Sequence, residues 1–148
     1  MLTIRNILVP TDFTETSDKA LDFALELAEK FDAKVTVMHS YEIPVLGFPD
    51  GALVATVDIA TGIMESAKKG LDAVVTARTA RGAKLASVLR DGNAWEEIKA
   101  VAEDLKADLI VIGTHGRRGI ARALLGSVAE NVIRTVKIPV LAIHGPRD

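Results

Sequence analysis

Four residues near the C-terminal end have the type and spacing of an anion-binding loop. They follow the pattern Gly113-x2-Gly116-x9-Gly126-Ser127 and lead into a segment with helical periodicity. Glycine lets backbone N–H groups approach a phosphate closely, because it adopts conformations that other residues resist. The N-terminus of a helix adds unpaired donors and a favourable dipole. The stretch between the glycines also contains three arginines that could contact an anion: Arg117, Arg118 and Arg122.

A structural interpretation of the same residues is also open. Gly113 can simply end a strand. Ser127-x-x-Glu130 matches a capping box, in which the two side chains satisfy the first N–H groups of a helix. From these residues alone, phosphate binding and helix capping cannot be separated.

A second group of candidates is Pro10-Thr11-Asp12, which follows the first strand-like run. The Asp12 carboxylate can accept hydrogen bonds from sugar hydroxyls. Aspartate is also a favoured N-cap residue, and a helical pattern begins shortly after it. Both roles remain open for Asp12.

Several kinds of chemistry are disfavoured by what the sequence lacks. Without cysteine there are no disulfides, thiolate metal sites or cysteine nucleophiles. His39, His115 and His144 show no metal-ligand spacing with one another or with a carboxylate pair. No Walker loop occurs, no G-x-G-x-x-G follows the first strand, and no phospho-acceptor aspartate ends the third. Lacking a strong general base or a metal-binding carboxylate cluster, the sequence predicts that any phosphate chemistry would be slow.

Composition and length set the broad class. The chain has 148 residues, a net charge of −2 and a mean hydropathy of +0.25. This length predicts a single domain over residues 1–148, and the charge gives no attraction to nucleic acid or anionic membranes. There is no secretory signal, and no apolar run approaches the ~20 residues that span a bilayer. The expectation is a soluble cytoplasmic protein.

The elements that must position the candidate residues alternate between strand and helix. Near-continuous apolar runs, typical of parallel strands covered on both faces, predict strands at residues 4–10, 34–39, 83–89, 108–113 and 139–144. Four stripes with helical spacing lie between them. The order predicts an α/β fold: a doubly wound, five-stranded parallel sheet in the order 3-2-1-4-5, with helices on both faces. One long irregular stretch, residues 40–55, interrupts the pattern.

In a doubly wound sheet, ligands bind beyond the carboxyl ends of the strands, where the strand order reverses. For the order 3-2-1-4-5, this point lies between the first and fourth strands. Pro10-Thr11-Asp12 follows the first and the Gly113 loop follows the fourth. The two groups of candidates are therefore predicted to face each other across one crevice.

Four segments, taken together and in this order, resemble the universal stress protein family over nearly the whole chain. They are residues 7–13, 107–116, 124–133 and 139–141. The intact pattern G-x2-G-x9-G-[S/T] is similar to that of the family's ATP-binding branch. The resemblance implies an adenine-nucleotide-binding protein of the stress response, with ATP and Mg²⁺ as its cofactors.

The resemblance also assigns roles by matching position. Pro10, Thr11 and Asp12 would border the nucleoside, with Asp12 accepting from the ribose hydroxyls. Ser40 is where the backbone would meet the adenine edge. The ribose side and the phosphates would be lined by Ile112, Gly113, His115, Gly116, Gly126, Ser127 and Val128.

Two other functions are compatible with the sequence, and the edge of the predicted sheet suggests a homodimer. The chain could be a nucleotide-independent dimeric adaptor, like the family's other branch, or a slow ATPase or phosphotransfer protein. Residues 138–143 are predicted to form an apolar strand at an open edge of the sheet. Such an edge can pair with a second chain, so a homodimer is expected, as the resemblance to the family also implies. The protein partner, the stress and the choice among ATP, ADP, AMP and a cyclic nucleotide are not determined by the sequence.

Overall fold

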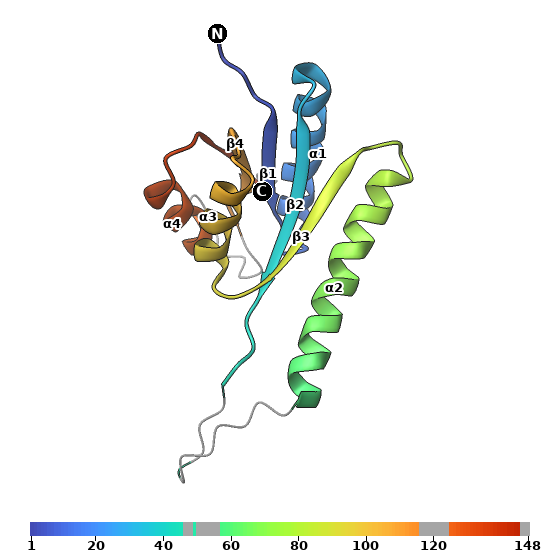
Figure 1. The fold of residues 1–148 in the computed structure, drawn as a ribbon, viewed down its shortest axis with the longest axis vertical. Coiled ribbons are helices and arrows are strands. Elements are labelled where there is room, and N and C mark those ends of the chain that lie inside the picture. Colours follow the sequence, from blue (N-terminus) through green and yellow to red (C-terminus); the bar gives the residue numbers. More distant parts are fainter. Residues whose placement is uncertain (46–48, 50–56, 116–124, 146–148) are drawn as a thin grey trace.

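A parallel sheet of five strands forms the centre of the molecule in the computed structural model (Figure 1). The structure describes residues 1–45, 49, 57–115 and 125–145. The strand order is β3-β2-β1-β4-β5, as predicted. The strands are β1 (Asn6–Pro10), β2 (Lys34–Tyr41), β3 (Leu85–Asp91), β4 (Leu109–Gly113) and β5 (Val140–Ile143).

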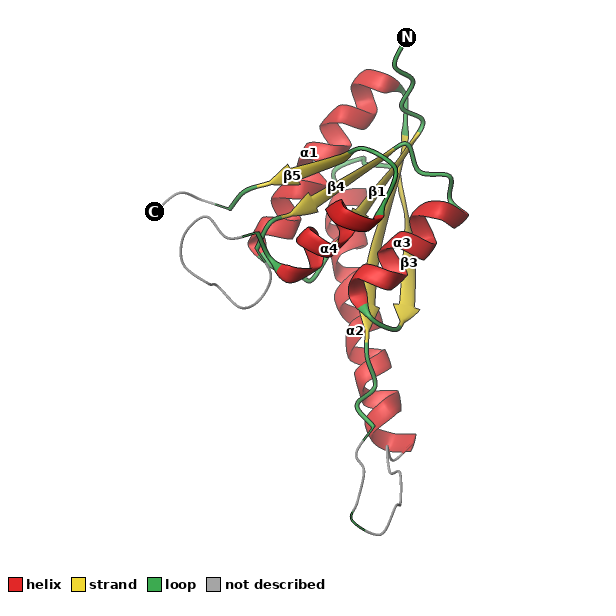
Figure 2. Cartoon of the chain, turned by 90° about the vertical axis from the view of Figure 1, so that its left-hand side faces the viewer, coloured by secondary structure: helices red, strands yellow, loops and turns green. Residues whose placement is uncertain are grey.

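Helices cover both faces of the sheet, which confirms the predicted doubly wound fold. Figure 2 shows the strands between two helical layers. The helices are α1 (Glu15–Phe31), α2 (Val57–Thr79), α3 (Ala94–Asp104) and α4 (Ser127–Thr135). In the described part of the chain, no helix is both long enough and apolar enough to cross a membrane.

Two apolar cores result, because successive side chains of a strand point to opposite faces. Ile7 and Val9 of β1 pack with α1 and α2. Leu8 of the same strand packs with α3 and α4. Each central strand therefore needs apolar residues at consecutive positions, which explains the near-continuous runs in the sequence.

The predicted boundaries of two strands are corrected by local hydrogen bonds. β3 begins at Leu85, not at Ala83, because the Ala83 N–H donates to the Arg78 carbonyl at 3.1 Å in the turn that ends α2. β1 begins at Asn6, where its pairing with Lys34 of β2 starts, and the N–H of the preceding Arg5 donates to a side chain.

That side chain is Asp108, which joins β1 to β4 where both strands begin. Its Oδ2 accepts from the N–H of Arg5 at 2.8 Å and of Asn6 at 2.9 Å. The Asp108 N–H in turn donates to the Asn6 carbonyl at 2.8 Å. The backbone N–H groups of Arg5 and Asn6 hold the pKa of Asp108 below its ordinary value, because they favour the charged carboxylate.

Replacing Asp108 with asparagine is expected to lower the melting temperature at pH 7 by about 2–4 °C. The stabilisation by this charge is fully present above the ordinary aspartate pKa, and it is lost as the pH falls through the lowered pKa. The wild type and Asp108→Asn should therefore converge in acid. Melting curves from pH 2 to 7 test this.

Asp104→Asn is the matched control, since Asp104 is an exposed aspartate in a surface ion pair with Arg90. It should change the melting temperature little at any pH. Equal melting temperatures for wild type and Asp108→Asn at pH 7 would contradict the role of Asp108.

Candidate functional site

β1 and β4 are joined by only two residue pairs, and the pairing stops before their carboxyl ends. The region between these two ends, from Pro10 to Gly113, is the crevice predicted from the sequence. The pairing of the two strands consists of Ile7 with Leu109 and Leu8 with Ile110. Beyond these two pairs, β1 continues along β2 and β4 continues along β5. The strands part at the point where the strand order reverses, which is where ligands bind in sheets of this kind.

Pro10 explains why the ladder between β1 and β4 stops. The N–H and the carbonyl of one strand residue point to the same side. Arg5 and Thr11 both bond to the β2 side: the Lys34 N–H donates to the Arg5 carbonyl, and the Thr11 N–H donates to the Met38 carbonyl, each at 2.8 Å. Pro10 therefore faces β4, where it has no N–H to continue the ladder.

The loop after β1 holds Asp12 close to the start of α1, but Asp12 is not its N-cap. The N-cap is Thr14, whose hydroxyl oxygen accepts from the Ser17 N–H at 3.3 Å. Asp12 Oδ1 accepts from the Thr14 N–H at 3.1 Å and from the Thr14 hydroxyl. The prediction that Asp12 caps α1 is therefore wrong: Thr14 is the N-cap, and Asp12 holds Thr14 in place.

Three of the predicted site residues share one face of the sheet at this edge. By strand alternation, Pro10, Ser40 and Ile112 lie on the same face as Leu8 and the α3–α4 core. Pro10 and Ile112 are buried, and Ser40 is partly exposed. The ends of β1, β2 and β4 therefore form one border of the crevice.

Gly113, at the end of β4, is in tight contact with α1. A Cβ at this position would lie 3.0 Å from Thr16 Cγ2 and 3.3 Å from the Ser17 backbone nitrogen. This packing is sufficient to require glycine at position 113. The presence of glycine at position 113 is therefore explained by its packing at the end of β4, as in the structural interpretation, without a phosphate nearby.

Thr114, the next residue, connects three elements. Its N–H donates to the Ile143 carbonyl at 3.0 Å, and its carbonyl accepts from the Gly126 N–H at 2.6 Å. Its buried hydroxyl lies 3.3 Å from Nδ1 of His144. The start of α4 is thereby held against the end of β4, opposite the loop that carries Asp12.

The N-terminus of α4 has no side-chain cap, so the capping-box interpretation of Ser127 is wrong. The N-cap is Gly126, and Ser127 is the first helical residue, with an exposed side chain. The Glu130 carboxylate pairs with Arg134 at 2.8 Å. The first helical bond runs from the Glu130 N–H to the Gly126 carbonyl. The N–H groups of the preceding turn therefore have no partner within the helix.

The structure thus brings most of the predicted site residues to one edge of the sheet. They are Pro10, Thr11, Asp12, Ser40, Ile112, Gly113, His115, Gly126, Ser127 and Val128. Gly116 and the three arginines at 117, 118 and 122 lie outside the described residues. Over the described ranges, no group of three histidine, aspartate or glutamate side chains is placed to hold a metal ion.

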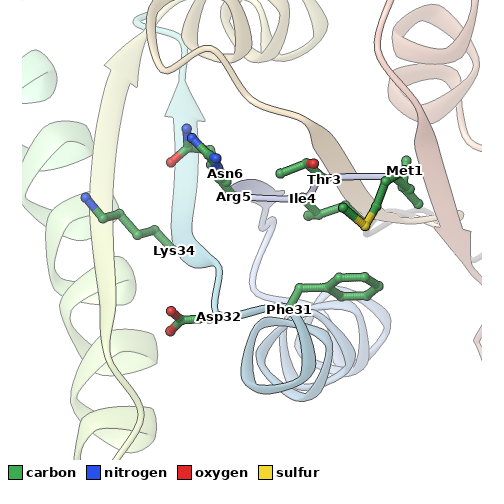
Figure 3. Close-up of a pocket in the computed structure, with 9 residues that line it drawn as sticks. Met1, Thr3, Ile4, Arg5, Asn6, Phe31, Asp32 and Lys34 are labelled. Carbon is green, nitrogen blue, oxygen red and sulfur yellow. The ribbon is translucent and has the colours of Figure 1, made fainter.

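Two hollows are lined by other residues. One, of about 550 Å³, is at the opposite end of β1 and is lined by Met1, Arg5, Phe31 and Lys34 among others (Figure 3). The other, of about 830 Å³, lies on the α2 face and includes Phe13, His39 and Tyr41. The second hollow was not predicted, and it brings His39 next to the loop that carries Asp12.

Comparisons with known proteins agree with the fold and its strand order. A model of the universal stress protein family matches residues 3–144. Universal stress protein MJ0531 of Methanocaldococcus jannaschii is 34% identical, over 97% of this chain and 84% of that protein. The solved structure of hypothetical protein MJ0577, from the same organism, is 28% identical and covers 99% of both chains, with a TM-score of 0.81.

Among the solved relatives is a universal stress protein in complex with cAMP, which is 26% identical to this chain. The match covers 97% of this chain and 99% of that one, with a TM-score of 0.72.

Replacing Gly113 with alanine is expected to destabilise the protein by about 1–3 kcal/mol, the usual cost of overpacking a tight contact. Adding Thr16→Ser removes the nearest methyl group and should recover part of this loss. A double-mutant cycle by chemical denaturation measures the coupling between the two positions.

Gly62→Ala serves as the control, because a Cβ there meets nothing within 4 Å. It lies within α2 and should stabilise the protein by up to about 1 kcal/mol. If Gly113→Ala proved as harmless as Gly62→Ala, the packing explanation for Gly113 would fail.

Proposed function

The chain belongs to the universal stress protein family, and on this premise we propose that it is a cytoplasmic stress-response regulator that binds ATP with Mg²⁺. The binding unit is one domain over residues 1–148. The site is the crevice between the ends of β1 and β4.

One observation carries this proposal: the N-terminus of α4 is exposed at the crevice without a side-chain cap. Gly126 provides no side chain, and Ser127 is part of the helix. N–H groups that have no partner within the helix, together with the helix dipole, favour an anion at this position. A phosphate chain is the anion we propose, with the nucleoside placed toward the ends of β1 and β2.

In this proposal, different residues of the site contact the ribose, the adenine and the phosphates. Asp12 accepts from the ribose hydroxyls, and Pro10 and Thr11 support the nucleoside. Ser40 meets the adenine, and Ile112 and Gly113 line the ribose side. The phosphates are surrounded by His115, Gly116, Gly126, Ser127 and Val128.

The complex of a family member with cAMP supports an adenine nucleotide as the ligand. Occupancy of the site, in this proposal, is the signal that a protein partner recognises.

Ser127→Glu is expected to weaken ATP binding by at least about tenfold, because a carboxylate near the phosphates repels them. The helix should remain stable, since an acidic residue in the first turn interacts favourably with the helix dipole. Calorimetric titration with ATP and Mg²⁺, preceded by mass analysis for co-purified nucleotide, measures the effect.

Ser87→Glu is the matched control: it makes the same change at another exposed serine, in β3. It should bind ATP as the wild type does. Absence of binding by the wild type at millimolar ATP would refute the nucleotide proposal and favour the dimeric adaptor. Equal affinities for Ser127→Glu and the wild type would show that the phosphates lie elsewhere.

We also propose that the chain forms a homodimer through β5. This strand is at one edge of the sheet, and all four of its residues are only partly buried. The Thr114 N–H donates to the Ile143 carbonyl, so odd-numbered positions of β5 face β4 and even-numbered positions face outward. The N–H groups of Val140 and Ala142 are thus directed to a second copy.

Ala142→Pro is expected to convert the dimer to a monomer, because it removes an outward N–H and leaves the bonds to β4 intact. Light scattering at micromolar concentration measures the mass. Ala142→Val keeps the N–H and should remain dimeric. A monomeric wild type, or a dimer that survives Ala142→Pro, would exclude edge pairing through β5.

A further inference from the structure

A histidine side chain ends the hydrogen-bond ladder between β1 and β2. The last backbone bond of this ladder runs from the Thr11 N–H to the Met38 carbonyl at 2.8 Å. In a parallel ladder, the next bond would run from the Ser40 N–H to the Thr11 carbonyl. Instead, Nδ1 of His39 lies 2.7 Å from that carbonyl oxygen.

This arrangement determines the tautomer of His39. A carbonyl oxygen can only accept a hydrogen bond, so Nδ1 carries the proton and donates it. The bond is between a side chain on the α2 face and the backbone of the loop that begins the candidate site.

The Ser40 N–H is left without its expected partner. In the described part of the chain, it has no hydrogen-bond acceptor. Its direction follows from the strand: the Lys34 N–H and the Met38 carbonyl both bond to the β1 side, so Ser40, at an equivalent position, points there as well. The N–H is therefore aimed at the crevice beside Pro10 and Asp12.

Packing holds the imidazole in place. The ring of Phe13 lies against it, with ring centroids 4.2 Å apart and an interplanar angle of 34°. Phe13 has a φ of +66°, an unusual conformation for a residue other than glycine. Its ring also rests on α2, where a Cβ at Gly70 would come within 2.8 Å of it. Position 70 must therefore stay small for Phe13 to stay over His39.

We propose that His39 is a positioning residue for the nucleobase: by binding the Thr11 carbonyl from the α2 face, it holds that oxygen out of line with the Ser40 N–H, which is left to donate to a purine ring nitrogen. The inference rests on the proposed function, since it concerns the base of the same nucleotide. A purine with a lone pair at that edge is selected, because a bound ring without an acceptor there would cover the Ser40 N–H and leave it unpaired.

His39 is outside the set of residues that contact the nucleotide. Its side chain lies in the hollow on the α2 face, with Phe13 and Tyr41. Ser40 lies on the opposite face, so the effect of His39 passes through the Thr11 carbonyl.

The first test is hydrogen exchange of the Ser40 amide in the nucleotide-free protein. The wild type should exchange this amide at least about tenfold faster than His39→Leu, in which the Thr11 carbonyl is free to accept from Ser40. His39→Asn restores a donor at the place of Nδ1 and should exchange as fast as the wild type. Equal exchange rates in wild type and His39→Leu would overturn the proposal.

The second test compares ATP with its 1-deaza, 3-deaza and 7-deaza analogues, each lacking one ring nitrogen. For the wild type and His39→Asn, one analogue should bind about threefold to tenfold more weakly than ATP, the effect of one lost hydrogen bond. In His39→Leu this difference should disappear. A deaza preference that is unchanged in His39→Leu would overturn the role of His39 in base selection.

The two tests separate this inference from the proposed function. Exchange of the Ser40 amide is measured without nucleotide, so it reports on His39 even if ATP does not bind. If the Ser40 amide exchanges faster in the wild type than in His39→Leu but ATP does not bind, the proposal of nucleotide binding is refuted. If ATP binds but the two exchange rates are equal, only the role of His39 is refuted.

Discussion

The parting of β1 and β4 is the constraint on which the rest of the structure depends. Two residue pairs join these strands, and an aspartate and a proline determine where the pairing begins and ends. Asp108 binds two successive N–H groups where the strands start. Pro10 supplies no N–H where they separate. The position at which the two halves of the sheet stop pairing is therefore set by the backbone.

The surrounding elements use this opening in different ways. α1 packs against the end of β4 so closely that Gly113 has no room for a side chain. α4 begins at an uncapped glycine, held by a bond from Gly126 to Thr114. On the β2 side, His39 replaces one backbone donor with a side-chain donor. The uncapped start of α4 and the bond from His39 each leave a backbone N–H group at this end of the sheet without a side-chain cap or a ladder partner.

Much of the fold could be predicted from the sequence, because apolar runs and helical stripes report burial directly. The strand order could also be predicted from the alternation of strands and helices, because the connections between parallel strands are right-handed and few strand orders are compatible with this rule. Local competition for hydrogen bonds could not be predicted in the same way. Asp12 and Ser127 both have the residue type of an N-cap, yet Thr14 and Gly126 occupy those positions. The role of His39 depends on the register of β1 with β2, which no spacing in the sequence reveals.

The position of Thr114 has a mechanical consequence. One peptide segment is bonded to the start of α4 through its carbonyl and to the end of β5 through its N–H. The residue between these two bonds is 1% exposed and therefore closely packed. A displacement of the α4 N-terminus is expected to move Thr114, and through it the end of β5, so the candidate site and the edge strand of the sheet are mechanically connected.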